Sequence, residues 1–129
     1  MRHHQRKLPL GLTAACLMLG GMAIASAADV QHGQDLFKDK CQECHTVRQG
    51  GANKKGPNLF GIVGRQAGSV ADFNYSDANK NSHQTWSEDN LVHYLQGPRN
   101  FMPGTKMKFK GFKQSQDAQD VVEYLKTLK

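Results

Sequence analysis

Two cysteines separated by two residues and followed directly by a histidine constrain this chain more than any other feature. They are Cys41, Cys44 and His45. Positions i and i+3 of a helical turn lie on one side, so both thiols can reach the same edge of a flat ligand. Cys-x-x-Cys-His is the pattern of covalent haem attachment, in which the thiols bond the porphyrin vinyl groups and the imidazole faces the iron. We therefore predict one haem c, attached through Cys41 and Cys44, with His45 as an iron ligand.

Two other uses of a cysteine pair fit this chain less well. A structural zinc site needs a second pair of ligands at metal spacing, whereas His32, His83 and His93 are isolated from one another. A thioredoxin-like redox pair needs a βαβ context, and no segment here alternates like a strand. Haem attachment is the interpretation that the spacing favours.

The first 27 residues have the pattern of a secretory signal. Basic residues precede an uncharged stretch rich in alanine, glycine and leucine, and Ala25-Ser26-Ala27 supplies small residues for cleavage before Ala28. We expect residues 1–27 to be a signal peptide and residues 28–129 to form one domain, exported to the bacterial periplasm.

Two other interpretations of the leader stay open. Residues 8–28 carry no charge and are just long enough to span a bilayer, so an uncleaved leader would anchor the protein in a membrane. Their many alanines and glycines make that span weakly hydrophobic. A lipoprotein attached through Cys16 fits less well, because Thr13 stands where a large apolar residue is needed.

Removing the leader changes what the composition means. Three of the 17 Lys and Arg residues lie in it, so 14 remain against 11 Asp and Glu, a net charge of +3 instead of +6. One of the three cysteines leaves as well, so only the haem-binding pair remains. The remaining 102 residues are too few for a doubly wound nucleotide-binding fold or a barrel enzyme. An apolar content of 38% makes a thin core, which a porphyrin in the middle would complete.

Three helices are expected, joined by long Gly-rich loops. The first spans Val30 to about Lys40, the second follows the N-cap Ser87 and stops at Gly97-Pro98, and the third begins near Ser115. A short helix near residues 76–81 is a further expectation, and residues 97–114 are expected to be irregular. The predicted fold class is all-α, with three main helices and loops wrapped around one haem.

A second iron ligand is expected among the methionines. Met102 and Met107 are the two that follow the leader, and a methionine is most often core filler. The Pro103-Gly104 turn can aim the next segment back at the iron, which favours Met107 and leaves Met102 as packing. His93, on an ordinary helix, is the competing ligand.

The chain resembles class I cytochrome c of the mitochondrial type and its bacterial periplasmic relatives, without a gap from Asp29 to Lys129. The matching motifs are Gly33 with Phe37, Cys41-x-x-Cys44-His45-Thr46-Val47, Gly56-Pro57-Asn58-Leu59, Gly61, Gly64-Arg65, Phe73-x-Tyr75-Ser-Asp-Ala-Asn79-Lys80, Trp86, Tyr94-Leu95, Pro98, Pro103-Gly-Thr-Lys-Met107-x-Phe109 and Tyr124-Leu125. The resemblance implies a single-haem carrier that moves one electron at a time between redox proteins of a respiratory or photosynthetic chain.

The resemblance also implies roles for particular residues. His45 would be the proximal ligand and Met107 the distal one, a pair that raises the reduction potential. The Pro57 carbonyl would accept the Nδ1–H of His45, unless Pro57 is only a turn residue, and Tyr94 would donate to the methionine sulfur. Buried haem propionates need hydrogen bonds. The residues that would form this polar network are Arg65, Tyr75, Asn79, Trp86 and Thr105. For Trp86 and Tyr94 the plainer interpretation is core packing. Gly33 and Phe37 would let the first helix cross the last at Val121 and Tyr124.

Basic residues near the haem-bearing segments suggest an acidic redox partner. Lysines are usually only a solvated surface, but the resemblance implies that several surround an exposed haem edge, where they would steer membrane oxidoreductase complexes, oxidases or dehydrogenases. They are Lys40, Lys54, Lys55, Arg99, Lys106, Lys108 and Lys113. Departures from the family pattern at Arg99-Asn100, Phe101 and Phe60 bear on this surface and not on the ligands. We expect the protein to be a monomer, and we expect no nucleic-acid partner.

Two rival functions come from other classes. A haem peroxidase would need an open position on the iron, which Met107 would close, and no distal acid–base histidine is placed for that chemistry. A ligand-sensing or structural haem module would likewise bind external ligands. We therefore expect a carrier and not an enzyme.

Overall fold

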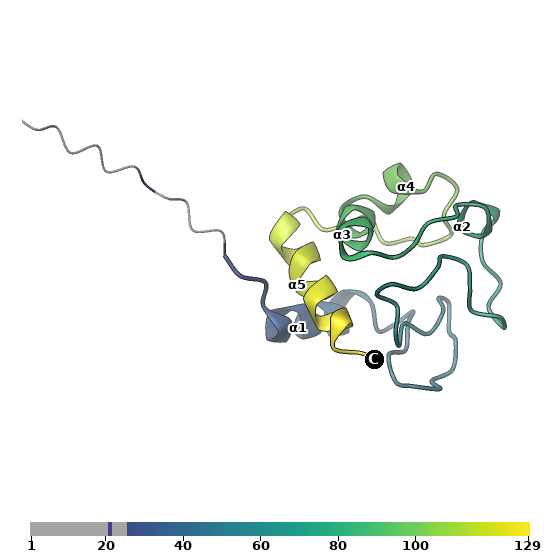
Figure 1. The fold of residues 1–129 in the computed structure, drawn as a ribbon, viewed down its shortest axis with the longest axis horizontal. Coiled ribbons are helices and arrows are strands. Elements are labelled where there is room, and N and C mark those ends of the chain that lie inside the picture. The colour runs from purple at the N-terminus through teal and green to yellow at the C-terminus, as the bar shows by residue number, and fades with distance from the viewer. Residues whose placement is uncertain (1–20, 22–25) are drawn as a thin grey trace, which may run out of the picture.

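The computed structural model describes residue 21 and residues 26–129, and this part of the chain folds into five helices joined by long loops (Figure 1). The predicted signal peptide lies almost wholly outside the described residues. In the described part, no helix is both long and apolar enough to cross a membrane. The helices are α1 (Val30–Lys40), α2 (Asp77–Lys80), α3 (Glu88–Gln96), α4 (Pro98–Phe101) and α5 (Ser115–Lys126). Apart from one isolated bridge between Gln66 and Thr85, the described residues pair no strands, which confirms the all-α prediction.

Short polar side chains set where three of the helices begin. The Asp29 carboxylate accepts the N–H groups of Gln31 and His32 at the start of α1. Ser76 and Ser87 do the same for α2 and α3, each accepting the N–H three residues later. Such caps satisfy backbone donors that have no partner within the helix. The predicted starts of α1 and α3 are confirmed.

One prediction about the loops is wrong. Residues 98–101 form the short helix α4 within the stretch that we expected to be irregular. Gly97-Pro98 does end α3, but proline is also favoured at the first position of a helix, where its missing N–H costs nothing. The same two residues therefore end one helix and begin the next.

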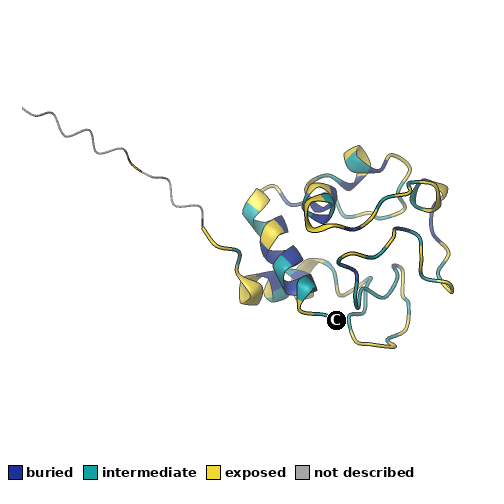
Figure 2. Cartoon of the chain, in the orientation of Figure 1, coloured by how far each residue is buried: buried dark blue, intermediate teal, exposed yellow. Residues whose placement is uncertain are grey.

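The first and last helices cross at very close range. A Cβ atom on Gly33 would collide with the backbone carbonyl of Asp120, so only glycine lets α1 and α5 approach this far. Next to this contact, the Phe37 and Tyr124 rings pack with their centroids 5.6 Å apart. Figure 2 shows the buried surfaces of α1 and α5 turned toward each other. α5 also packs on α3, and α3 packs on α4.

Side-chain hydrogen bonds to the backbone organise the loop after α1. The Asn58 amide donates to the Thr46 hydroxyl at 2.7 Å and to the Arg48 carbonyl at 2.9 Å. The Arg65 guanidinium donates to the carbonyls of Asn58 and Phe60 at 3.0 and 3.2 Å. These bonds replace the regular ladder that a loop lacks, and they fix the segment that carries Pro57.

Candidate functional site

The two cysteines lie on the turn that directly follows α1. Cys41 is the C-cap residue of the helix, and both Cys44 and His45 donate their backbone N–H to its carbonyl. Cys41 and Cys44 are both free thiols of intermediate burial. Burial, and then the neighbouring Cys44, raise the pKa of the Cys41 thiol to about 12. A thioredoxin-type redox cysteine needs a lowered pKa, so this environment is the opposite of what that alternative requires.

The imidazole of His45 is fixed by the loop that faces it. Its Nδ1 lies 2.8 Å from the Pro57 carbonyl oxygen, which can only accept, so the proton sits on Nδ1. A side chain on the buried Gly56 would collide with the ring. Burial lowers the pKa of His45, so the imidazole is neutral at pH 7 and its Nε2 carries a lone pair. A neutral ring with a fixed tautomer is the form that binds a metal.

The methionine segment is held by two hydroxyl groups. The Tyr94 hydroxyl lies 2.9 Å from the Thr105 hydroxyl and 3.9 Å from the Met107 sulfur. The Met107 N–H donates to the Thr105 oxygen at 3.3 Å. Met107 is only partly buried, whereas Met102 is 4% exposed and belongs to the hydrophobic core. Because Met102 fills the core, Met107 is the methionine whose sulfur is left with a polar partner.

His93, the competing ligand, lies on the exposed side of α3. The Pro103-Gly104 turn precedes Met107, and Gly104 adopts a φ of +92°, a conformation that favours glycine. Across this turn the Thr105 N–H donates to the Met102 carbonyl at 3.0 Å.

The residues assigned to the propionate network differ in what their polar groups contact. Tyr75 is buried and its hydroxyl accepts the N–H of Val70 at 3.1 Å. Arg65 uses two of its nitrogens on loop carbonyls, so part of its donor capacity holds the loop together. Trp86 packs its ring 4.8 Å from Tyr94 and stacks on Phe101 at 6.1 Å between centroids.

Asn79 carries the clearest sign that a polar group belongs in this region. Its Oδ1 is the single buried side-chain oxygen or nitrogen of the described residues that lacks a hydrogen-bond partner. Buried polar atoms in native proteins almost always have one. Together with the free thiols, the neutral His45 and the Met107 sulfur, this orphaned oxygen fits a prosthetic group that brings iron and polar substituents.

The sequence alone did not indicate a role for Asn58, although this residue belongs to the Gly56-Pro57-Asn58-Leu59 motif. Its carbonyl, amide oxygen and amide nitrogen all hold the loop that presents Pro57 to His45. The signal available was an asparagine directly after a Gly-Pro turn, a residue type that commonly bonds nearby backbone.

The basic residues expected at a partner surface are all exposed, but they differ in what they contact. Lys54 donates to the Gln42 carbonyl at 2.7 Å, and Lys55 pairs with Glu43 at 3.3 Å. Lys106 reaches the Asn74 carbonyl at 3.3 Å, and Lys40 pairs with Asp39 at 2.8 Å. Arg99, Lys108 and Lys113 are exposed as well.

Comparison with known proteins agrees with this geometry. A family model described as Cytochrome c matches residues 30–129. A cytochrome c of Guizotia abyssinica is 46% identical over 104 residues, 81% of this chain and 94% of that protein. A cytochrome c of Theileria annulata is 50% identical over 103 residues, 80% of this chain and 89% of that protein. One from Gibberella zeae is 46% identical over 101 residues, 78% and 95% of the two chains.

These comparisons contradict one prediction. The expected location in the bacterial periplasm is wrong, because the similar proteins come from plants, fungi and Theileria, which are eukaryotes. That expectation rested on the leader pattern, and residues 1–20 and 22–25 lie outside the described part of the chain.

Proposed function

The chain belongs to the cytochrome c family and carries electrons on a single, covalently attached haem c, and we propose that His45 and Met107 are the two protein ligands of its iron. The observation that carries this proposal is the bond between His45 Nδ1 and the Pro57 carbonyl. It leaves Nε2 as the coordinating atom and sets the plane of the ring.

Tyr94 supports the assignment of Met107. Burial raises the pKa of Tyr94, while the Thr105 hydroxyl opposes that effect, so the phenol is protonated at pH 7. It can therefore donate to the Met107 sulfur and limit the rotamers that the side chain adopts. When bound, the haem supplies a one-electron Fe(II)/Fe(III) couple, whose potential a thioether ligand raises.

The remaining polar residues are proposed to serve the propionates. Asn79 would use its unpartnered oxygen through water, or its amide nitrogen directly. Thr105 and Tyr75 would contribute their hydroxyl groups. Arg65 and Trp86 complete the set, with Arg65 contributing the donors that its loop carbonyls leave over. These groups would compensate buried negative charge that is otherwise costly.

We further propose that the protein is a carrier and not an enzyme. Two protein ligands would leave the iron no open position for peroxide, oxygen or another small molecule. The rival peroxidase and sensor functions both need such a position.

The visible spectrum of the ferric protein tests the ligand pair. We expect the weak red band of the sulfur–iron bond in the native protein, and we expect it to vanish in Met107→Ala. Carbon monoxide should bind the reduced Met107→Ala protein readily and the native protein poorly at neutral pH. Met102→Leu is the matched control, because it replaces a core methionine with a residue of similar volume and should keep the band. A band that survives in Met107→Ala would remove Met107 as a ligand.

We also propose that residues 1–27 are a leader that is removed, so that residues 28–129 form the cytochrome domain. The support is that contacts with the rest of the fold reach as far as Asp29, whose backbone N–H donates to the Asp120 carboxylate at 2.8 Å. The intact mass of the purified protein, with haem attached, decides whether Ala28 is its first residue.

A further inference from the structure

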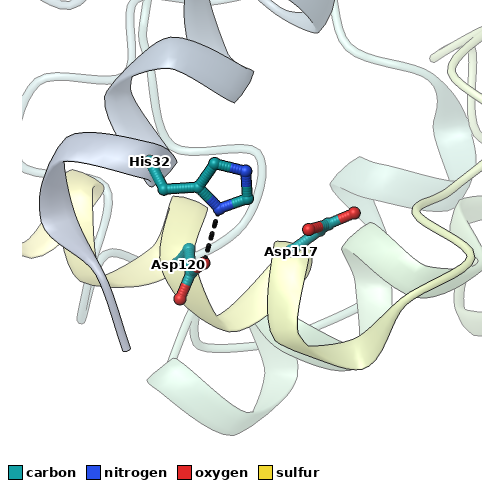
Figure 3. Close-up of side chains that lie close together, drawn as sticks. All are labelled: His32, Asp117 and Asp120. Atoms are coloured by element: carbon teal, nitrogen blue, oxygen red, sulfur yellow. Dashed lines mark hydrogen bonds and ion pairs between the residues drawn. The ribbon is translucent and has the colours of Figure 1, made fainter. Parts of the chain in front are cut away.

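Three side chains that have no part in the haem site converge where α1 crosses α5. His32 comes from α1, and Asp117 and Asp120 come from α5 (Figure 3). Each offers one ligand atom, and these three atoms lie within 4.8 Å of one another. Their side chains thus gather imidazole and carboxylate groups at one place on the surface.

The buried member of this cluster fixes the orientation of the exposed one. Asp120 Oδ2 lies 2.7 Å from His32 Nδ1, and Asp120 Oδ1 accepts from the Asp29 N–H and the Gln116 amide at 2.8 and 2.9 Å. The Asp120 side chain is 4% exposed, whereas the His32 side chain is 49% exposed. The carboxylate therefore holds the Nδ1 proton and leaves the Nε2 lone pair on the accessible side of the ring.

This arrangement is the one that metal-binding histidines use. Their second ring nitrogen almost always donates to a carboxylate or carbonyl, which selects the tautomer and makes the coordinating nitrogen more basic. Asp117 supplies a further ligand, since it lies one helical turn before Asp120 on the same face of α5, and Figure 3 shows its carboxylate beside the edge of the ring that carries the two nitrogens.

The local charge also favours a cation. Asp29, Asp117 and Asp120 all act on His32, and the hydrogen bond that His32 donates to Asp120 is the main reason why the pKa of His32 is raised. Among the ion pairs of the described residues, His32 is the only partner of any of these three acids. With Asp29 beside the cluster, three carboxylates thus act on one imidazole.

We propose that His32 and Asp117 bind a divalent transition-metal ion of the Zn²⁺ class, with Asp120 as the positioning residue and water in the remaining coordination places. Imidazole and carboxylate together suit zinc, whereas calcium and magnesium prefer all-oxygen sites. The ion would join α1 to α5. Because the ion would bind the folded arrangement only, it would stabilise the protein without touching the haem ligands.

Calorimetric titration of ZnCl₂ into the chelator-treated ferric holoprotein tests this proposal. We expect one equivalent of zinc to bind, with the affinity reduced at least tenfold in His32→Gln and in Asp117→Asn. Glutamine at position 32 can still donate to Asp120, so the helix contact is kept while the coordinating nitrogen is lost. Asp117 is only half-buried, so its replacement leaves the core intact should the first variant fold poorly. Asp120→Asn should weaken binding by about 10-fold to 100-fold, as loss of an orienting carboxylate does.

His93→Gln is the matched control. It removes another exposed histidine, one that has Asp89 a turn earlier on α3, and it should leave zinc binding unchanged. Thermal unfolding provides the second measurement: zinc should raise the midpoint of the native protein and of His93→Gln, but not of His32→Gln. Absence of zinc binding, equal binding in His32→Gln, or equal competition by CaCl₂ would each overturn the proposal.

Discussion

The Nδ1 of His45 donates to the carbonyl oxygen of Pro57 across 2.8 Å, and this bond joins the turn after α1 to the loop that follows it. Asn58, the next residue, ties that loop back to Thr46 and Arg48. The orientation of the His45 imidazole is therefore set by a backbone carbonyl, and the next residue along the chain holds that carbonyl's loop in place.

Gly56→Ala should disturb this arrangement directly. The added methyl group would collide with the His45 ring, so we expect a loss of about 1–3 kcal/mol in the free energy of unfolding, as overpacking generally causes. Denaturant unfolding of the holoprotein measures it. Gly97→Ala is the control, because a Cβ there meets nothing closer than 3.5 Å. Equal stability of the two variants would contradict the tight fit around the imidazole.

Tyr94→Phe should lower the reduction potential. The variant removes a hydroxyl that lies 3.9 Å from the Met107 sulfur. The positive hydrogen of this hydroxyl disfavours the extra positive charge of Fe(III), so its loss favours the oxidised form. A redox titration followed by absorbance gives the potential. Tyr124→Phe, on α5 beside Phe37, should leave the potential unchanged. An unchanged potential in Tyr94→Phe would mean that the hydroxyl does not act on the sulfur.

His83→Gly should stabilise the protein slightly. His83 is exposed and adopts a φ of +53°, a left-handed conformation that costs a side-chain-bearing residue about 1–2 kcal/mol. Glycine avoids that cost but loses more backbone entropy on folding, so we expect a net gain of about 0.5 kcal/mol in urea unfolding. His83→Ala keeps the strain and should show no gain. A less stable glycine variant would show that the histidine side chain contributes to stability.

The His32–Asp120 pair should make stability depend on pH in a defined window. The hydrogen bond that His32 donates to Asp120 raises the pKa of His32 above its ordinary 6.5, so this contribution is complete below pH 6.5 and is lost as the pH rises through the higher value. Burial opposes ionisation of Asp120, but the bonds from His32, Asp29 and Gln116 leave the pKa of its carboxyl below the ordinary 3.8. Its contribution is complete above pH 3.8 and is lost as the pH falls through the lower value. The pair therefore contributes most between about pH 3.8 and 6.5.

Urea unfolding of the native protein and of His32→Gln, both in EDTA, measures this contribution. The difference in unfolding free energy between the two should shrink above neutral pH, as the histidine loses its proton. A difference that stays constant from pH 5 to 9 would show that the charged imidazole adds nothing beyond its hydrogen bond.

Charge reversal at Lys108 or Lys113 should slow electron transfer to an acidic redox protein. Both side chains are exposed and follow Met107 in the sequence, so a glutamate there should lower the association rate several-fold at low salt and flatten its dependence on ionic strength. Stopped-flow reduction of the partner at several salt concentrations gives both quantities. Lys38→Glu, on the exposed side of α1, is the control. An equal effect of Lys38→Glu would point to net charge instead of a local docking surface.

Local signals explain which parts of the fold the sequence predicted. α1 and α3 follow capping side chains, and α1, α3 and α5 all show apolar residues at helical spacing, so all three were predicted. α4 was missed because its first residue, Pro98, also ends the preceding helix. A single proline can end one helix and begin the next, and the sequence does not show that α4 finds α3 to pack against.

Contacts across long sequence separations could be predicted only where a family motif implied them, as at Gly33 and Phe37. His32 and Asp120 are 88 positions apart, and neither belongs to a motif, so nothing in the chain pairs them before α1 and α5 cross. The two carbonyls that accept from the Arg65 guanidinium were missed for a related reason. Every residue has a backbone carbonyl, so the sequence does not show which one a side chain will reach. Cys41, Cys44 and His45 were found because covalent attachment requires a fixed local spacing.

The close contact between Gly33 and Asp120 also makes the haem-binding region depend on two helices from opposite ends of the described segment. All the residues of that region lie between α1 and α5, and α1 packs on α5 more extensively than on any other helix of the described residues. Without α5, α1 would lose this partner, and the turn that carries the two thiols would no longer be held against the rest of the fold. A substitution that weakens this twelve-residue helix should therefore loosen the haem-binding turn without touching any of its residues.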